Sequence, residues 1–308
     1  MIRPLNFIPY NTNIQFIRVR KLTFALSAAM CLLSATLFFI PGLNYGIDFS
    51  GGVLIEARAT QSDADLGDMR GKLSALGLGE IALQDFGSTR DVLIRVQTQG
   101  NEKADNAAVE TVRKALGPGF EFRRTEVVGP KVGGELVEAG TIASILAMLG
   151  IAVYVWFRFE WQFGVAALVA TFHDVIATVG FFGLLQLDFN LSTLAAVLTI
   201  AGYSINDTVV VFDRIRETMR KYKTMEFGAL INRAINDTLS RTIMTSSTTM
   251  LAVLALVIFG GEVIRGFAIA MVWGIIVGTY STMYVAAPLL FYMRPPRPTE
   301  SAAAAATP

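Results

Sequence analysis

Residues 163–185, FGVAALVATFHDVIATVGFFGLL, form an apolar run whose only ionisable side chains are His173 and Asp174. A helix needs about 20 apolar residues to cross the roughly 30 Å of hydrocarbon in a bilayer, and this run is long enough. A helix that is apolar around its whole circumference is typical of a membrane span or of the core of a large protein. The run therefore predicts a membrane-spanning helix.

Five further apolar runs lie on either side of it, at residues 22–40, 139–157, 191–212, 242–260 and 267–293. The composition agrees with so many spans: 53% of the 308 residues are hydrophobic, 17% are charged, and the mean hydropathy is +0.51. Ordinary soluble domains carry about 25% charged residues. We therefore expect a membrane protein with six transmembrane helices and not a soluble enzyme.

Rare residue types exclude several kinds of site. The single Cys and the single His leave no disulfide framework and make a metal site built on Cys and His improbable. The net charge of +1 gives no basis for nucleic-acid binding. We expect no cofactor, no metal and no nucleic-acid partner.

The positive charges predict how the chain is oriented, because Lys and Arg concentrate in cytoplasmic loops. The loops 186–190 and 261–266 contain one such residue, Arg265, whereas the other short connections and both ends of the chain are rich in them. We expect both termini in the cytoplasm and the first run as an uncleaved signal anchor. The residues on the cytoplasmic side are Arg3, Arg18, Arg20, Lys21, Arg158, Arg214, Arg216, Arg220, Lys221, Lys223, Arg233, Arg241, Arg294 and Arg297.

The polar stretch between the first two runs has the periodicity of a small α+β domain. Strand patterns occur at 53–60, 80–86, 91–98 and 120–128, and helical patterns at 63–76 and 101–116. The order βαββαβ predicts a ferredoxin-like domain, and its position after the first span places it in the periplasm. It has no His, no Cys and no Gly-rich phosphate loop, so we expect an interaction domain.

The expected organisation follows from these patterns. Residues 225–240 place an apolar face on one side of a helix, which predicts an interfacial amphipathic helix on the cytoplasmic side. The expected domains are a cytoplasmic segment at 1–21, the first transmembrane helix at 22–41, the periplasmic domain at 42–136, the other five helices with the amphipathic segment at 137–293, and a disordered tail at 294–308.

Two ionisable residues near the cytoplasmic ends of spans are candidates for proton coupling. Asp207 lies inside the run 191–212, and Arg241 lies at the entrance of the run 242–260. If the second helix begins a turn or two earlier, the two side chains reach similar depths, and a carboxylate that takes up a proton releases its Arg partner. That is the chemistry of a proton-coupled switch, but the pair can equally be a structural lock between helices. Asn206 and Ser204 can supply hydrogen bonds or hold water.

A second candidate is the pair His173 and Asp174 in the run 163–185. It can extend a proton path or form a polar contact between helices. We do not expect enzymatic catalysis, because the sequence has no HExxH motif, although a serine aligned with His173 is not excluded by sequence.

Four motifs resemble the SecF family of protein-export membrane subunits. They are GIDFSGG at 46–52, FHD at 172–174, GYSINDTVVVFDRIRE at 202–217 and SRTIMTS at 240–246. The resemblance covers about residues 7–293, and the long third motif is its most specific part. The motif residues also include Gly46, Asp48, Gly51, Gly52, Gly202, Asp213 and Arg214, together with Ser204, which is named above.

The resemblance implies an RND-like six-helix bundle in the bacterial inner membrane. It implies pairing with SecD, association with the SecYEG channel and with YajC, and use of the proton gradient to promote late translocation and release of exported polypeptides outside the membrane. In that family the acid matching Asp207 and the arginine matching Arg241 are implicated in proton conduction. Two alternatives remain open from the residues: half of an RND-type small-molecule exporter, and a passive scaffold of a membrane complex.

Overall fold

The computed structural model describes residues 12–61 and 63–296, and these residues form two compact units. A helical unit comprises 12–43, 144–187 and 195–296, and a mixed α/β unit comprises 44–143 and 188–194 apart from residue 62. The expected disordered tail from residue 297 onward and the first eleven residues of the expected N-terminal segment lie outside the described residues.

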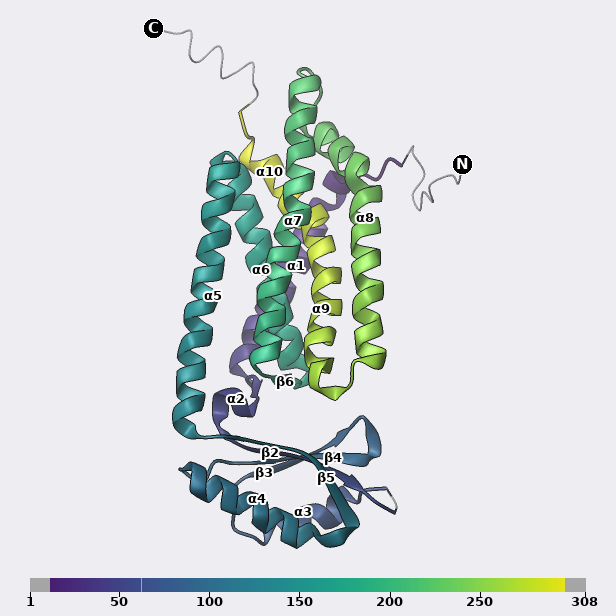
Figure 1. Ribbon diagram of the computed structural model, residues 1–308. Helices are drawn as coiled ribbons and strands as arrows, with labels where there is room; N and C mark the ends of the chain where they lie inside the picture. Colours follow the sequence, from purple (N-terminus) through teal and green to yellow (C-terminus); the bar gives the residue numbers. More distant parts are fainter. Residues whose placement is uncertain (1–11, 62, 297–308) are drawn as a thin grey trace. The chain divides into compact units, whose positions relative to one another are not determined.

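Six helices in the described part of the chain are long and apolar enough to cross a membrane, as the sequence predicted. The sixth is interrupted by one π-helical turn, η2. The elements are α1 (Phe16–Phe39), α5 (Pro130–Arg158), α6 (Trp161–Leu185), α7 (Leu191–Lys221), α8 (Phe227–Phe259), α9 (Glu262–Ser281), η2 (Thr282–Ala286) and α10 (Ala287–Met293), and Figure 1 labels most of them.

We expected a separate interfacial helix at 225–240, but residues 227–240 are the first part of α8. Its apolar residues Leu230, Ile231 and Ile235 are fully buried against other helices rather than facing a lipid surface. Its polar side carries Asn232, whose Oδ1 accepts a hydrogen bond from the backbone N of Ile17 at 3.0 Å. Because this segment packs inside the bundle, α8 continues without a break from it into the apolar run 242–260. In the same way α7 continues past 212 to Lys221.

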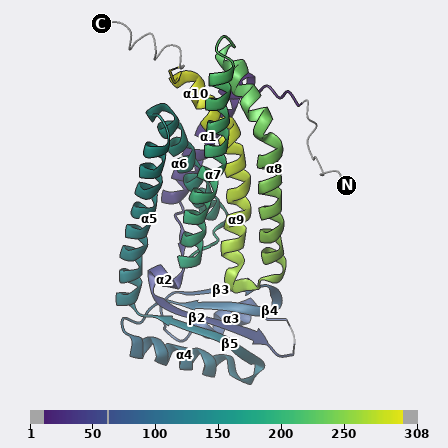
Figure 2. The same ribbon diagram turned by 45° about the horizontal axis from the view of Figure 1, so that its top comes forward.

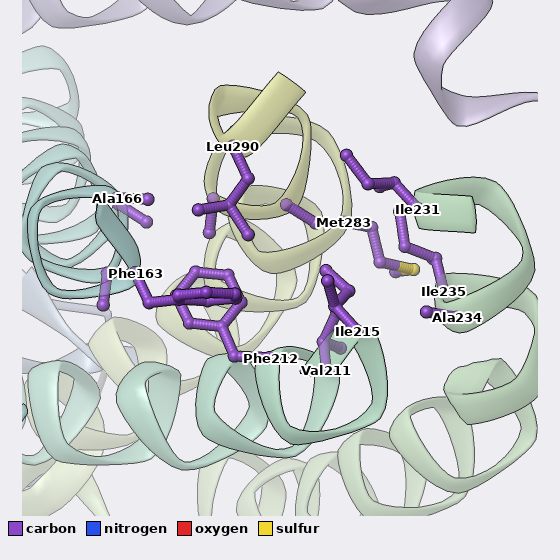
Figure 3. Close-up of a cluster of buried hydrophobic side chains, with 14 of the residues drawn as sticks. Phe163, Ala166, Val211, Phe212, Ile215, Ile231, Ala234, Ile235, Met283 and Leu290 are labelled. Carbon is purple, nitrogen blue, oxygen red and sulfur yellow. The ribbon is translucent and has the colours of Figure 1, made fainter. Parts of the chain in front are cut away.

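One large apolar cluster joins α6, α7, α8 and the C-terminal helix (Figure 3). Phe163 and Phe212 meet edge to face, with ring centroids 5.2 Å apart at 73°. Ile231 and Leu290 are both fully buried in the same cluster. This cluster fixes the part of α7 that follows the candidate residue Asp207.

Glycines let two pairs of helices approach closely. A Cβ at Gly180 on α6 would overlap the side chain of Ser34 on α1 and lie 2.6 Å from its Cα. On α9, Gly274 faces the side chain of Ile200 and Gly278 faces Ser204, both on α7. One face of α7 therefore packs closely against Gly274 and Gly278 of α9.

The mixed unit contains a four-stranded antiparallel sheet in the order β3-β4-β2-β5. Both longer helices, α3 and α4, pack on one face of this sheet, which Figure 2 shows from a second direction. The strand order is that of a split βαβ arrangement, so the ferredoxin-like expectation is confirmed. Its elements are β2 (Gly52–Ala59), α3 (Leu66–Ser74), β3 (Ile81–Phe86), β4 (Ser88–Val96), α4 (Glu102–Leu116), the 3₁₀ turn η1 (Gly117–Gly119) and β5 (Phe120–Val128).

A small parallel pairing was not predicted. Strand β1 (Asn44–Tyr45) pairs with β6 (Asp188–Phe189), and a one-turn helix, α2 (Ile47–Ser50), follows β1. Two-residue strands are too short to show any alternation of polar and apolar residues, so the sequence gives no signal for them.

The buried carboxylate of Asp91 links strands β4 and β2 of the sheet. Asp91 on β4 accepts two hydrogen bonds from Arg58 on β2, each 2.6 Å long, and one from Ser88 at 2.7 Å. The Arg58 hydrogen bonds, with help from Ser88, hold the pKa of Asp91 at about 2, below its ordinary value of 3.8, although burial acts in the opposite direction. Such bidentate pairs are stronger than single contacts.

We expect Arg58→Met to lower the melting temperature at pH 5 and to flatten its decline in acid. Because the folded pKa of Asp91 is below the unfolded one, its contribution is present above about pH 4 and is lost toward about pH 2. Thermal unfolding of the purified chain in detergent at several pH values checks this. Arg124→Met, which removes a half-exposed partner of Glu126, serves as the control. An unchanged acid dependence in Arg58→Met would contradict the assignment.

Candidate functional site

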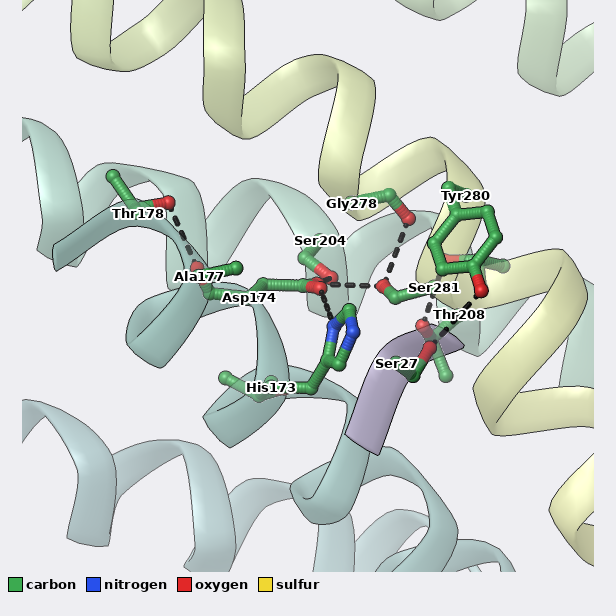
Figure 4. Close-up of polar contacts among 12 residues, drawn as sticks. Ser27, His173, Asp174, Ala177, Thr178, Ser204, Thr208, Gly278, Tyr280 and Ser281 are labelled. Atoms are coloured by element: carbon green, nitrogen blue, oxygen red, sulfur yellow. Dashed lines mark hydrogen bonds and ion pairs between the residues drawn. The ribbon is translucent and has the colours of Figure 1, made fainter. Parts of the chain in front are cut away.

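Asp174 on α6 is a fully buried carboxylate, 0% exposed, that joins three helices (Figure 4). Its Oδ2 accepts a hydrogen bond from Ser204 Oγ on α7 at 2.5 Å and another from Ser281 Oγ on α9 at 2.7 Å. Its Oδ1 lies 2.8 Å from Nδ1 of His173. A change in the charge of this one side chain therefore alters contacts on α7 and α9 together.

The end of α9 has room for this arrangement because of a glycine. A Cβ at Gly278 would lie 3.3 Å from the Cβ of Ser204 and 3.7 Å from Asp174 Oδ2. Ser281 is the last residue of α9, and the π-helical η2 begins at Thr282. Single π turns inside helices often occur at functional sites. The hydroxyl of Thr282 lies 3.0 Å from that of Thr208, which forms a second polar contact, between η2 and α7.

His173 is nearly buried, at 5% exposure, and carries one unused nitrogen. Its Nδ1 faces Asp174, whereas Nε2 is buried and has no hydrogen-bond partner among residues 12–61 and 63–296. With Nδ1 protonated and held by the carboxylate, Nε2 is an acceptor. The ring centroid lies 6.2 Å from that of Tyr280. Nε2 is thus the atom of the imidazole that stays open to a further hydrogen bond.

Asp207 lies one helical turn beyond Ser204 on α7 and is 6% exposed. Its Oδ2 is buried, and none of the described residues donates a hydrogen bond to it. An ionised carboxylate in this position is costly unless a proton or a positive charge compensates it. The carboxyl group of Asp207 therefore lacks the hydrogen-bond donor or positive charge that would stabilise its ionised form.

Arg241 lies well inside α8, which begins at Phe227, so the early helix start required by the expected pairing is present. Within the described part of the chain, however, Oδ2 of Asp207 has no partner, and the two side chains form no ion pair. The side chain of Arg241 is exposed. The predicted contact between Asp207 and Arg241 is thus not made in this structure.

The other motif residues of α7 serve different purposes. Asn206 and Gly202 are exposed, so the structure does not bring Asn206 into the cluster around Asp174. At the far end of the helix, Asp213 pairs with Arg158 at 2.5 Å, and Arg214 pairs with Asp237 at 2.6 Å. These partly exposed ion pairs tie α7 to neighbouring helices and are individually weak.

The glycine motif lies in the mixed unit, at the start of the sheet. Gly51 and Gly52 have φ values of 69° and 118°, and a Cβ at Gly52 would lie 2.5 Å from the carbonyl oxygen of Val96. Their backbone conformation and the close approach of β4 both require glycine. Asp48 Oδ2 accepts a hydrogen bond from the backbone N of Leu191 at 2.9 Å. Gly51 and Gly52 of this motif therefore have a structural role, and Asp48 makes a specific hydrogen bond to the first residue of α7.

Sequence reasoning missed three hydroxyl residues of the site, namely Thr208, Ser281 and Thr282. A signal exists at residues 279–282, TYST, where four hydroxyl side chains follow one another inside an apolar span. The sequence favours the pair Asp207 and Arg241 over Asp174, whereas in the structure Asp174 has the larger set of partners. Among the described residues, no three His, Cys, Asp or Glu side chains come together as metal ligands.

Two family models match the chain. One is described as protein export membrane protein SecD/SecF, C-terminal, and matches residues 108–295. The other is the SecD/SecF GG motif, which matches residues 36–63 and thus includes the glycine motif and Asp48.

Curated relatives match over almost the whole length. The protein translocase subunit SecF of Rickettsia rickettsii is 48% identical over 293 residues, which is 94% of each chain. The protein of the same name from Rickettsia bellii is 47% identical over 295 residues, 94% of this chain and 96% of that one.

Solved structures agree in fold. The crystal structure of SecDF from Thermus thermophilus, described as a translocon-associated membrane protein, has a TM-score of 0.84 and 37% identity over 92% of this chain. A super-membrane-facing form of SecDF has a TM-score of 0.70 and 36% identity over 96% of this chain. The chain spans 39% and 41% of those two longer chains. It belongs to the SecF family of protein-export membrane proteins.

Proposed function

We propose that the chain is an accessory subunit of Sec protein export that uses the proton gradient, together with SecD, to promote late translocation and release of exported polypeptides. Membership of the SecF family supports the export role, and it favours protein cargo over the small molecules of an RND-type exporter. The proton-coupling part of the proposal stands on the side chains described above.

The observation that carries the proposal is the buried Oδ2 of Asp207, which has no hydrogen-bond partner in the part of the chain that the structure describes. Two events can offset the desolvation penalty of an ionised Asp207. It binds a proton, which leaves Arg241 free, or it stays ionised and pairs with Arg241. Alternation between these states brings α7 and α8 together and lets them separate. If the proton enters from one side of the membrane and leaves to the other, the gradient drives that movement.

Asp174 and His173 form the second part of the proposed proton path. Ser204 lies on the same helix as Asp207, one turn away, and donates directly to Asp174. His173 extends the chain of polar groups with its free Nε2. Protonation of Asp174 would weaken its hold on the hydroxyls of α7 and α9, so both carboxyl groups act on the position of α7.

Exposed polar groups on the membrane helices support a partner of the SecD type. Asn206 and Arg241 belong to motif segments, yet both side chains are exposed in this chain. Polar groups at membrane depth normally face protein or water rather than lipid. We propose that SecD covers this face, that the pair acts at the SecYEG channel, and that YajC joins the assembly.

We place the protein in the bacterial inner membrane with both termini in the cytoplasm and the ferredoxin-like domain in the periplasm. The distribution of Lys and Arg supports this orientation. The two described ends of the chain lie at the same end of the helical unit, because Arg20 near the start of α1 stacks on the ring of Phe291, 4.3 Å from its centroid.

Asp207→Asn tests the proposal. We expect its export rate with the gradient intact to fall to the rate that the unmodified protein shows after the gradient is collapsed, because an amide cannot exchange a proton at Oδ2. The measurement is export of a secreted protein in cells with matched membrane abundance of each variant, with and without a protonophore.

Asp213→Asn is the matched control, since it changes an acid on the same helix that lies in partly exposed ion pairs. It should keep the response to the gradient. Normal gradient-dependent export in Asp207→Asn would instead support the passive scaffold, in which polar groups only hold helices together.

A further inference from the structure

The outer end of α7 is held by two capping groups, one local and one distant. Asn190 is the local cap, and its Oδ1 accepts hydrogen bonds from Thr193 N at 2.9 Å and Ser192 Oγ at 2.7 Å. Asp48 is the distant one, and its carboxylate accepts from Leu191 N at 2.9 Å. The first N–H groups of a helix point along its axis, and they carry the positive end of the helix dipole. The contact from Asp48 therefore opposes displacement of α7 along its own axis.

Asp48 is itself firmly placed beside this helix end. It lies on α2, which follows Gly46, and Gly46 N donates to the carbonyl of Phe189 at 2.8 Å. A Cβ at Gly46 would lie 3.0 Å from the Cβ of Asn190, so the two segments are in close contact. On its other side, α2 continues through Gly51 into strand β2 of the four-stranded sheet. A shift of the sheet is thus passed directly to Asp48.

A second connection joins the sheet to the same segment. Arg95 on β4 forms a salt bridge with Asp188 at 2.6 Å and donates to Asn44 Oδ1 at 2.9 Å. Asn44 in turn donates to Asp188 at 2.8 Å. Both acceptors belong to the short β1–β6 pairing, which precedes α2 on one strand and α7 on the other. The mixed unit therefore includes the first turn of α7 as part of one packed body.

From this first turn α7 continues without a break to Lys221. Ser204 lies roughly 20 Å along the helix axis from Leu191, and Asp207 one turn further. Ser204 and Ile200 sit against the two glycines of α9, so the helix is guided where it reaches Asp174. Because α7 is one continuous helix, a displacement of its first turn along the axis acts on the residues further along it.

We propose that Asp48 is a positioning residue for the proton site, which acts through α7 and couples the state of Asp207 and Asp174 to the ferredoxin-like domain. This inference rests on the proposed function of those two acids. It assigns Asp48 a role in transmitting movement and none in carrying protons. The structural alternative is that Asp48 only stabilises the fold.

Asp48→Ala and Asp48→Asn, each in membranes that also contain the SecD-type partner, distinguish these roles. In Asp48→Ala we expect gradient-dependent export to fall about fivefold, which is the factor that corresponds to the free energy of one N-cap hydrogen bond. Proton conductance of the membrane vesicles should stay at the unmodified level. Asp48→Asn should restore export, because its amide oxygen still accepts from Leu191 N. Conductance is followed with a pH-sensitive dye, and variants are compared at equal membrane abundance.

Three results would overturn the inference: unchanged export in Asp48→Ala, no rescue by Asp48→Asn, or a loss of conductance that parallels the loss of export. Hydrogen exchange gives an independent readout, since the amide of Leu191 should exchange about fivefold faster in Asp48→Ala and at the original rate in Asp48→Asn. Asp207→Asn is measured in parallel. If that variant still conducts protons, the proposed function fails, whereas the exchange result still decides whether Asp48 holds α7.

Discussion

Asp174→Asn is expected to abolish the gradient-dependent part of export, and Asp174→Ala to lower the free energy of unfolding by about 1–3 kcal/mol in addition. Asparagine fills the same space but cannot release a proton. With its oxygen accepting from Ser204 and Ser281, its NH₂ group would face Nδ1 of His173. Alanine leaves the hydroxyls of Ser204 and Ser281 buried without their shared acceptor. Export with and without a protonophore measures the first effect, and thermal unfolding in detergent measures the second.

Thr178→Val is the matched control for both variants. Thr178 is also buried on α6, but its hydroxyl donates to the backbone carbonyl of Asp174 at 2.8 Å, within the helix. Removing that hydroxyl leaves the carboxylate and its partners intact, so the response to the gradient should remain. If Asp174→Asn kept the response while Asp207→Asn lost it, Asp174 would be a structural joint between helices and the proton path would not include it.

The two carboxyl groups differ in how they are held, and this difference suggests a division of roles. Asp174 has donors from two other helices, whereas Asp207 Oδ2 has none among the described residues. A group with satisfied hydrogen bonds resists change, and a group without them is the one that gains from a proton or from Arg241. We therefore expect Asp207 to respond first and Asp174 to transmit the response to α9.

The sequence could predict the elements that carry a strong periodic signal. Six apolar runs identify the membrane helices, and alternation identifies the ferredoxin-like strands. The helix ends could not be placed, because hydropathy falls where a helix leaves the hydrocarbon although the helix itself continues. Residues 227–240 are the clearest case, since burial against Phe16 and Ile17 of α1, and not hydropathy, decides that they belong to α8.

The candidate site was predictable only where its residues are rare in membrane spans. Asp174, His173 and Asp207 stand out because ionisable groups are costly there. Ser281 does not stand out, since a hydroxyl in such a helix usually bonds to its own backbone, as Thr171 does with the carbonyl of Ala167 at 3.0 Å. The contact from Asp48 to Leu191 spans 143 positions, so no local pattern indicates it.

Gly180→Ala should lower the free energy of unfolding by about 1–3 kcal/mol, although it adds a single methyl group. An added Cβ would overlap Ser34 on α1 and lie 2.6 Å from the Ser34 Cα. The obstacle includes backbone, so no rotamer change removes it and α1 must move away from α6. The loss of close packing between these helices then outweighs the gain of about 1 kcal/mol in helix propensity that alanine normally brings over glycine.

Gly202→Ala provides the comparison, because Gly202 also lies in a membrane helix, but among the described residues an added Cβ would meet no atom within 4 Å beyond its chain neighbours and its own helix backbone. Its free energy of unfolding should stay equal or rise. Ser34→Gly in the Gly180→Ala background should restore part of the stability, since it removes the overlapping side chain and leaves the Cα in place. Thermal unfolding of the three purified variants in one detergent decides the matter, and equal stability of Gly180→Ala and Gly202→Ala would show that α1 and α6 do not need this close approach.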